Sequence, residues 1–356
     1  MERSSLVMKL GDGPDSYFRN SKWQESALGK AKSLLADGIL GSLQVPKDGQ
    51  VFAIADFGCS VGPNTFSCID IIIDAVKHKY QTEEVDPVPE FQAFFNDQVD
   101  NDFNTLFKRL PHDRGYMAAG VPGSFHGRLF PKSSIHLMTT NMSVHWLSKV
   151  PEAAREPAGG ALFNKARITY ARSSEPITQA FRDQFYSDMK TFLNARSQEL
   201  APGGLLAILV PGRPEGTSPS ESIQIQLLEC LGDALADMVK EGIISEDLID
   251  SFNIPCFMPM ASEMEEIVAS SGTNFSIKTL AELHIPTDVR NSKAELQVVT
   301  SYTRAITDCV FSQHFSPQVV DEIFTRFPDK LQNLFKDPRF AQVDRWESLF
   351  TLLARV

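Results

Sequence analysis

Short apolar runs alternate with longer helical segments between residues 51 and 210, and this alternation constrains the fold more than any other feature. Five runs have the length and apolar content of buried strands: 51–56, 91–95, 116–119, 135–140 and 205–210. Helical patterns at 66–76 and 176–200 lie between them. Strands that alternate with helices in this way predict a doubly wound α/β sheet, whose ligands bind at the carboxyl ends of the strands.

Outside this region the pattern is mostly helical. Residues 214–272 are rich in Glu, Asp, Leu and Ile at helical spacing. The remaining elements that we expect are helices at 15–39, 222–241, 246–252, 262–270, 295–311 and 317–327, and a last strand near 349–356. We therefore predict an α/β core formed by residues 1–213 and 273–356, with residues 214–272 as a helical cap over its carboxyl edge.

The composition is that of an ordinary soluble protein. Of 356 residues, 42% are hydrophobic and 22% are charged, and the formal net charge is −11. Nucleic acids and anionic membranes bind clustered Lys and Arg, so neither is expected as a partner, and an acidic substrate must be captured by local donors. The five cysteines are scattered without a CxxC pair, which indicates reduced thiols. No apolar leader and no apolar run of about 18 residues occurs, so we expect a cytoplasmic protein.

The loop after the first predicted strand is the first candidate binding element. Its sequence from Asp56 to Asn64 is Asp-Phe-Gly-Cys-Ser-Val-Gly-Pro-Asn, and it opens a predicted helix. Glycine lets the backbone approach a ligand closely, and a helix start offers free N–H groups. The spacing G-x-x-x-G differs from the dinucleotide fingerprint G-x-G-x-x-G, and the acid at the tip of the second predicted strand, Asp97, lies 41 residues after Asp56 instead of about 20. Both observations disfavour a nicotinamide-dependent oxidoreductase.

Two acids near this loop suit a different nucleoside. Asp97, at the tip of the second predicted strand, can accept hydrogen bonds from both hydroxyls of a ribose, and Asp56 can bind an ammonium group. S-adenosyl-methionine (SAM) carries a ribose, an ammonium and a sulfonium, so a site with two acids and no Lys favours it over a pyrophosphate. The alternative interpretation is that Asp56 caps a helix and the loop is a structural turn.

Several longer motifs occur in the order of one known family. They are Met8-Lys9; Asp15–Tyr17 with Asn20-Ser21 and Gln24; Ala55–Asn64; Phe95–Gln98 with Asn101–Asn104; Val121–Pro131; Ser143–Ser148; and Phe252–Pro255. On these motifs the chain resembles, nearly from end to end, the plant SABATH family of SAM-dependent carboxyl and N-methyltransferases. That family includes salicylate, benzoate, jasmonate, indole-acetate and caffeine-pathway enzymes. The resemblance implies a Rossmann-like methyltransferase sheet with a helical cap, SAM as the cofactor, and a homodimer.

The resemblance also implies which residues bind the cofactor. Carried over position by position, the SAM site consists of Tyr17, Ser21, Asp56, Cys59, Asn64, Asp97, Gln98, Ser124 and Phe125. Position 98 departs from the family, where it is usually Leu. The polar amide of Gln98 puts in doubt how this side chain packs beside the adenosine.

On the acceptor side, the resemblance implies Gln24, His145 and Trp146. The Gln24 amide and the Trp146 indole are both hydrogen-bond donors, and two donors can grip one carboxylate. A carboxylic acid has a pKa of roughly 4, so its methylation needs no general base, and the enzyme contributes proximity and alignment. Without the resemblance, a core aromatic is the favoured interpretation of Trp146, and Gln24 is part of a solvated helix face. For His145, a packed or exposed imidazole stays an open alternative even with the resemblance.

Two further groups of residues follow from the alignment with this family. The first lines the acceptor pocket and consists of Leu228, Phe257, Thr303, Ile306 and Trp346, a largely apolar set that favours a compact aromatic acid and that can equally be core of the cap. The second is a possible magnesium site formed by Asp250, Asn253 and the Phe252 carbonyl. Arg172 stands where the family has a further Asn ligand and should repel a cation, so Asp250 can instead be a structural residue at a helix end.

The sequence thus predicts an O-methyltransferase that forms the methyl ester of a small aromatic acid of benzoate, salicylate or cinnamate type, or of indole-3-acetate. The methyl group passes from SAM to the carboxylate by direct SN2 displacement. Two alternatives stay open: N-methylation of a purine alkaloid on the same scaffold, and a non-catalytic protein that binds a small acid.

Overall fold

A single seven-stranded sheet forms the centre of the protein. The computed structural model describes residues 7–11, 13–47, 51–155, 164–287, 292–341 and 343–356. In these ranges the strand order is β3-β2-β1-β4-β5-β7-β6. The strands are β1 (Phe52–Phe57), β2 (Phe91–Asp97), β3 (Met117–Pro122), β4 (Ile135–Asn141), β5 (Leu200–Pro211), β6 (Phe275–Pro286) and β7 (Arg345–Arg355).

Strands β1 to β5 are parallel, whereas β7 is antiparallel to both of its neighbours, β5 and β6. Every residue of β1 is buried, which is typical of a central parallel strand covered on both faces. From β1 the chain continues to β2 and β3 on one side and from β4 to β5 on the other. Such a reversal of strand order opens a crevice at the carboxyl ends of the two strands where it occurs, here β1 and β4.

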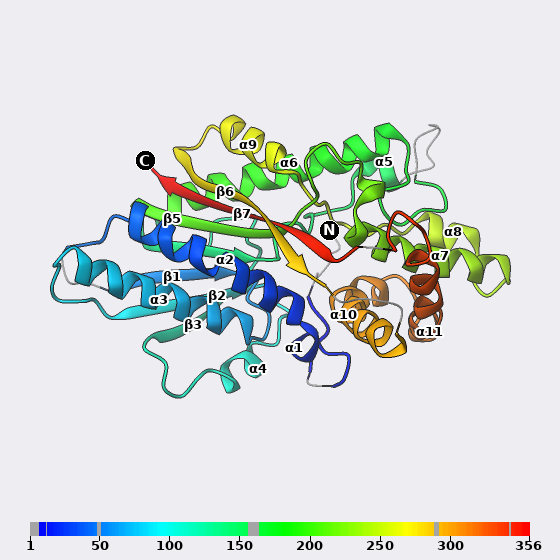
Figure 1. Cartoon of the computed structure of the whole chain (residues 1–356), viewed down its shortest axis with the longest axis horizontal. Coiled ribbons are helices and arrows are strands. Elements are labelled where there is room, and N and C mark those ends of the chain that lie inside the picture. The colour runs from blue at the N-terminus through cyan, green and yellow to red at the C-terminus, as the bar shows by residue number, and fades with distance from the viewer. Residues whose placement is uncertain (1–6, 12, 48–50, 156–163, 288–291, 342) are drawn as a thin grey trace.

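Helices cover both faces of the sheet (Figure 1). Those of the N-terminal half are α1 (Tyr17–Asn20), α2 (Lys22–Ser42), α3 (Asn64–Thr82), α4 (Phe103–Lys108), α5 (Glu152–Arg155) and α6 (Glu175–Glu199). The β1–α3–β2 and β4–α6–β5 connections progress in opposite directions along the sheet, so right-handed crossovers place α3 and α6 on opposite faces. Helix α2 packs beside α3.

The remaining helices gather mainly beyond the carboxyl ends of the parallel strands, on the right of Figure 1. They are the 3-10 helix η1 (Pro219–Glu221), α7 (Ile223–Lys240), α8 (Glu246–Asp250), α9 (Ala261–Ser270), α10 (Lys293–Ser312) and α11 (Pro317–Leu334). Helix α11 packs against α7 and α10, whereas α9 packs on α6 and β6. The division into a core and a 214–272 cap stays a prediction. None of the helices in the described ranges is both long and apolar enough to cross a bilayer.

The predicted doubly wound α/β fold is confirmed, with local corrections. The helix expected at 15–39 is two helices, α1 and α2, with Ser21 between them. No element was expected at 275–286, where β6 lies at the sheet edge with mostly half-buried side chains and therefore lacks a strand-like apolar pattern. The helix expected to end at 327 continues through Pro328, because Leu331 and Leu334 are buried. Strand β7 begins at Arg345, earlier than the expected 349.

The turn after β1 depends on Gly58. This residue has a φ of +81°, and a Cβ added there would overlap the Ser143 hydroxyl. That hydroxyl donates a hydrogen bond to the Phe57 carbonyl at 3.1 Å and thereby joins the ends of β1 and β4. Gly29 is different, because it lies in α2 with open space around it.

We predict that Gly58→Ala lowers the free energy of unfolding by about 1–3 kcal/mol, because the new side chain is strained in this backbone conformation and displaces Ser143. Gly29→Ala is the matched control and should raise the free energy of unfolding by roughly 0.5–1 kcal/mol. Urea denaturation measures both. Equal urea midpoints for Gly58→Ala and the wild type would contradict the role of Gly58 in the turn after β1.

Candidate active site

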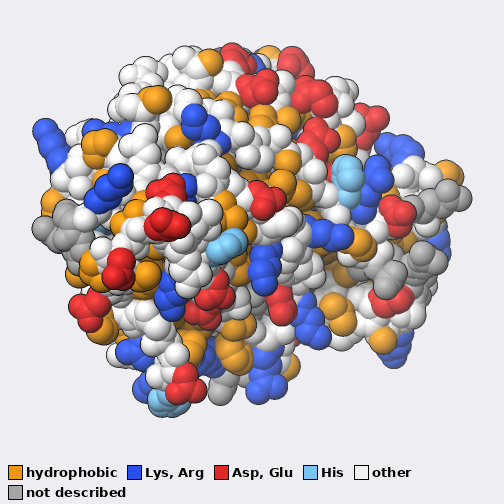
Figure 2. All heavy atoms as spheres, turned by 60° about the vertical axis from the view of Figure 1, so that its left-hand side comes forward, with side chains coloured by type: hydrophobic (Ala, Val, Ile, Leu, Met, Phe, Trp, Pro, Cys, Tyr) orange, Lys and Arg blue, Asp and Glu red, His pale blue; other side chains and the backbone are white. Residues whose placement is uncertain are grey.

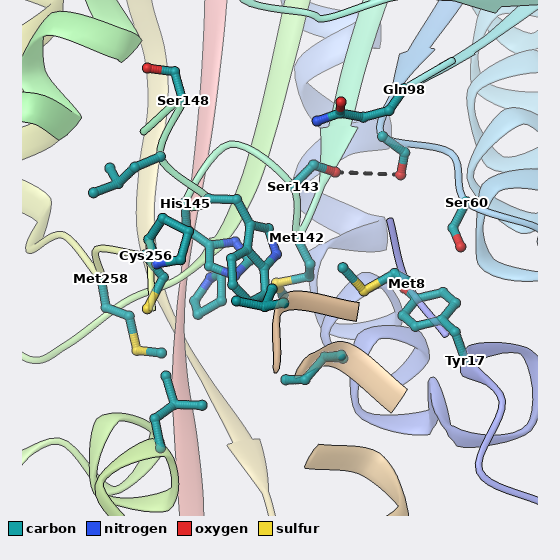
Figure 3. Close-up of a pocket in the computed structure, with 18 of the residues that line it drawn as sticks. Met8, Tyr17, Ser60, Gln98, Met142, Ser143, His145, Ser148, Cys256 and Met258 are labelled. Atoms are coloured by element: carbon teal, nitrogen blue, oxygen red, sulfur yellow. Dashed lines mark hydrogen bonds between the residues drawn. The ribbon is translucent and has the colours of Figure 1, made fainter. Parts of the chain in front are cut away.

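A cavity of about 1270 Å³ lies at the carboxyl ends of β1, β2 and β4. Pockets for a single drug-sized ligand are roughly 300–1,000 Å³, so this cavity has room for two ligands side by side. In Figure 3, Tyr17, Ser60 and Gln98 lie on one side of it and His145, Cys256 and Met258 on the other. We call the two sides the nucleoside half and the acceptor half.

In the nucleoside half, Asp97 connects two strand ends. Its carboxylate accepts hydrogen bonds from the backbone N–H groups of Ser60 at 2.7 Å and Gln98 at 2.8 Å. Burial raises the pKa of Asp97 to about 6. A carboxylate has about four lone-pair positions, so Asp97 retains acceptor capacity toward the cavity. Ser124 and Phe125, from the loop after β3, line the same half.

Four of the predicted cofactor residues lie behind this wall and are not among the residues that line the cavity: Ser21, Asp56, Cys59 and Asn64. Asn64 donates from its amide to the Ser21 carbonyl at 3.1 Å, close to Tyr17, which does line the cavity. Burial, with contributions from the charges of Asp97 and Asp56, raises the pKa of the Tyr17 phenol far above its ordinary value.

Asp56 is the most unusual group of the site. It is 2% exposed, and only one of its carboxylate oxygens has a partner, the Thr65 hydroxyl, while Oδ1 has none among the described residues. Burial first, and then the Asp97 charge, raises the pKa of Asp56 to about 7 against the lowering effect of Thr65. Asp56 is therefore only partly ionised near neutral pH, and a cation bound beside the two acids would favour their charged forms.

The three residues predicted to hold the acid, Gln24, His145 and Trp146, all line the cavity and are buried, and their role toward the acid stays a prediction. Gln24 lies on α2, and the other two follow β4. The His145 carbonyl accepts from the Phe257 N–H at 2.9 Å, and Trp146 forms a β-bridge with Cys256, so the backbone fixes this segment. Burial lowers the pKa of His145 to about 3, and the imidazole is neutral at physiological pH.

Several residues that line the cavity have a buried polar atom without a partner. Among the described residues they are Trp23 (Nε1), Gln24 (Oε1), His126 (Nδ1), His145 (Nδ1) and Thr303 (Oγ1). Buried polar groups without hydrogen bonds are rare in folded proteins, and each needs a physical explanation. A polar ligand that completes these groups is the simplest explanation for those that line the cavity.

Three aromatic rings form the wall next to Gln24. The ring centroids of Trp23 and Trp346 are 5.2 Å apart, those of Tyr302 and Trp346 are 5.5 Å apart, and those of Trp23 and Tyr302 are 6.0 Å apart. Sequence reasoning identified Trp346 but missed Trp23 and Tyr302, although each directly neighbours a predicted site residue.

The other predicted pocket residues divide into two groups. Leu228, Thr303 and Ile306 line the cavity. Phe257 does not line it, because its ring stacks between Tyr170 and Phe185, with centroids at 5.1 and 5.2 Å. The cavity is also lined by sulfur-bearing side chains that were not predicted as site residues, namely Met8, Met142, Cys256 and Met258 (Figure 3).

The predicted metal ligands are occupied by protein donors. Asp250 Oδ1 accepts from the Ala166 N–H at 2.7 Å, and Asn253 Oδ1 accepts from the Asn164 amide at 2.7 Å. Arg172 forms ion pairs with Glu229 and Asp233. In the described ranges no group of three or more His, Cys, Asp or Glu residues is arranged to hold a metal ion. These donors do not fit a magnesium site, and we derive no step from an ion.

The pKa of Asp56 predicts how stability depends on pH. The folded-state value of about 7 lies above the ordinary value of 3.8, so this carboxyl stabilises the fold below pH 4, and the contribution is lost as the pH rises through 7. Asp56→Asn removes the titration. Relative to the wild type, this variant should gain up to about 1.4 kcal/mol of stability per pH unit between pH 5 and 7.

Urea denaturation of the ligand-free protein at several pH values measures this difference. Asp329→Asn, at an exposed position of α11, is the control and should follow the wild type. If the free energies of unfolding of Asp56→Asn and the wild type changed in parallel with pH, the raised pKa of Asp56 would be ruled out.

Comparison with known proteins agrees with this geometry. Residues 3–351 match the family model described as SAM dependent carboxyl methyltransferase. Loganic acid O-methyltransferase from Catharanthus roseus is 38% identical over 92% of this chain and 88% of its own. Caffeine synthase 1 from Camellia crassicolumna is 33% identical over 99% of this chain and 96% of its own.

A solved structure gives the same result. A loganic acid methyltransferase with S-adenosyl-homocysteine (SAH) superposes with a TM-score of 0.91 at 37% identity, covering 98% of each chain. The predicted SABATH-type family and SAM as its cofactor are confirmed. The cavity at the carboxyl ends of β1, β2 and β4 is thus found in a chain that belongs to the SAM-dependent carboxyl methyltransferase family.

Proposed function

We propose that this protein forms the methyl ester of a small aromatic carboxylic acid, using SAM as the methyl donor. The observation that carries the proposal is the acceptor half of the cavity. There, the His145 ring and the Thr303 hydroxyl, each with a buried unpartnered polar atom, line the same cavity as the aromatic wall, and the Gln24 amide NH₂ is a further donor. A ligand that suits both features has a flat apolar body and a polar end.

In this proposal the nucleoside half holds SAM. Asp97 reaches the cavity and accepts hydrogen bonds from the ribose hydroxyls, while Gln98, Ser124 and Phe125 lie beside the adenosine. Asp56 lies behind the wall, so it favours the ammonium group through its charge rather than by direct contact. When bound, SAM supplies a methyl group on a positively charged sulfur, which the negative potential of the two acids favours.

The acceptor residues bind and orient the acid. The carboxylate is already ionised at neutral pH, so no residue needs to remove a proton. The Gln24 amide and the Trp146 indole donate hydrogen bonds to it, and the neutral His145 offers one further ring N–H. Holding the carboxylate oxygen in line with the methyl group supplies catalysis by proximity, an effect that can reach about 7–11 kcal/mol. The aromatic wall excludes water from this end.

N-methylation of a purine is the second candidate, because caffeine synthase 1 is similar along the whole chain and because three clustered rings can also stack on a purine. The two candidates are separated by supplying methyl-labelled SAM with a panel of benzoates, cinnamates and indole-3-acetate or with xanthines. Label in a base-labile methyl ester supports the carboxyl proposal. Label only in methylxanthine refutes it, and SAM binding without any turnover indicates a non-catalytic protein.

We predict that Gln24→Ala and Trp146→Phe lower kcat/KM for the acid about 10- to 100-fold, because each removes a donor to a charged group worth roughly 1.5–3 kcal/mol. Trp146→Phe keeps a ring of similar shape and deletes only the N–H. The dissociation constant of SAH should change by less than about twofold in both variants.

Steady-state assays with the best acid of the panel, together with calorimetric SAH titration, measure these effects. Gln198→Ala, at an exposed position of α6, is the matched control and should behave as the wild type. If Trp146→Phe retained full activity, the indole N–H would have no role in holding the carboxylate.

A further inference from the structure

One face of α6 carries a row of buried residues that contacts both halves of the cavity. The row consists of Asp188, Phe192, Arg196 and Glu199, and spacings of four, four and three residues put them on one side of the helix. Asp188 is 6% exposed, and the other three are fully buried. Three charged residues in such a position require partners, and nearly all of these partners belong to the two segments that line the cavity.

The C-terminal part of the row holds the nucleoside half. Arg196 donates from Nη1 to the Phe125 carbonyl at 2.8 Å, from Nη2 to the Gly127 carbonyl at 2.7 Å and from Nε to Glu199 at 2.7 Å. Glu199 accepts from the backbone N–H groups of Leu129 and, at 2.9 Å, Phe130. This ion pair therefore fixes the backbone of residues 125–130.

Phe192 adds an apolar contact to the same segment. Its ring meets that of Phe125 edge to face, with centroids 6.0 Å apart and an interplanar angle of 89°. The Arg196 guanidinium also lies over the Phe57 ring at the end of β1, 4.2 Å from its centroid. The loop after β3 is thus held by one helix in both its backbone and its side chain.

The N-terminal part of the row holds the acceptor half. Asp188 accepts hydrogen bonds from the Ser148 N–H at 2.8 Å and from the Ser148 hydroxyl at 2.6 Å. Ser148 lines the cavity two residues after Trp146 and lies on the same side as His145 in Figure 3. The position of the 143–148 segment is therefore fixed to the same helix that fixes residues 125–130.

Stability alone does not explain this arrangement. Desolvating a buried ion pair is costly, and apolar residues of similar size often stabilise a core equally well or better. The pair here instead uses the planar, multidentate geometry of arginine, which positions several acceptors at once. Methyl transfer in line requires donor and acceptor to be held at a fixed mutual position, and a rigid helix that grips both segments provides this.

We propose that Asp188, Phe192, Arg196 and Glu199 form an α6 clamp, a set of positioning residues that sets the two halves of the cavity relative to each other. Arg196 and Glu199 position the nucleoside half, and Asp188 positions mainly the acceptor half, although its charge also acts on His126 of the 125–130 segment. The second part rests on the proposed function, since it assumes that the segment 143–148 receives the acid.

Two conservative variants separate the two arms of the clamp. Arg196→Lys keeps the charge and the pairing with Glu199 but loses the fork that binds both carbonyls. We expect about a tenfold rise in the SAH dissociation constant and in the KM for SAM, with the KM for the acid changed less than twofold. Asp188→Asn cannot accept both hydrogen bonds from Ser148. We expect about a tenfold loss of kcat/KM for the acid with SAH affinity unchanged.

The matched controls are Arg182→Lys and Asp183→Asn, which make the same changes on α6 away from the cavity. Arg182 pairs with Glu263 and Glu266 on α9, and Asp183 is exposed. Both should leave SAH affinity and acid kinetics as in the wild type. Melting temperatures of all four variants identify losses that come from reduced stability.

The effects of the two clamp variants on the two ligands test the proposal. If both clamp variants lower the melting temperature but leave the SAH dissociation constant and the KM values of the folded protein unchanged, the residues are structural and the clamp is refuted. Equal effects of both variants on both ligands also refute it. If the wild type methylates no acid in the panel, the proposed function and the acceptor arm fail together, while SAH titration of Arg196→Lys still decides the nucleoside arm.

Discussion

The carboxylate of Asp97, held between the backbone N–H groups of Ser60 and Gln98, is the contact on which the cavity depends. It ties the glycine-containing loop after β1 to the end of β2, and this geometry exists because parallel strands bring their carboxyl ends to one edge of the sheet. Gly58 allows the same loop to pass close to Ser143 at the end of β4. The ends of β1 and β4, between which the strand order reverses, thereby form one wall of the nucleoside half.

The charges around the cavity are arranged locally rather than across the surface. On the face in Figure 2, acidic and basic side chains are interspersed, and the chain as a whole is acidic. Asp56 and Asp97, with raised pKa values, lie beside the nucleoside half, whereas the lining from His145 to Arg155 carries a neutral imidazole and the basic Lys149 and Arg155. This separation suits a cationic donor and an anionic acceptor, because each meets groups of suitable polarity only in its own half.

Much of the fold and part of the site follow from the sequence. The strand–helix alternation predicts the doubly wound sheet, and the family motifs point to Gln24, His145 and Trp146, all of which line the cavity. Edge strand β6 and the continuation of α11 through Pro328 depend on tertiary packing, which the local sequence pattern does not contain.

For the same reason the sequence did not distinguish Asp97, which lines the cavity, from Asp56, which does not. It also missed the row on α6, because Arg and Glu at helical spacing usually indicate a solvated face. The homodimer and the cytoplasmic location stay predictions.

The central claim is that one cavity orients donor and acceptor in two distinct halves, and a crystal structure of the protein with SAH and the best acid tests it most directly. The account predicts the ribose hydroxyls on Asp97, the sulfur at the boundary between the halves, and the carboxylate within hydrogen-bond distance of the Gln24 amide and the Trp146 indole. A carboxylate turned away from both donors, or an adenosine bound in the acceptor half, would contradict it.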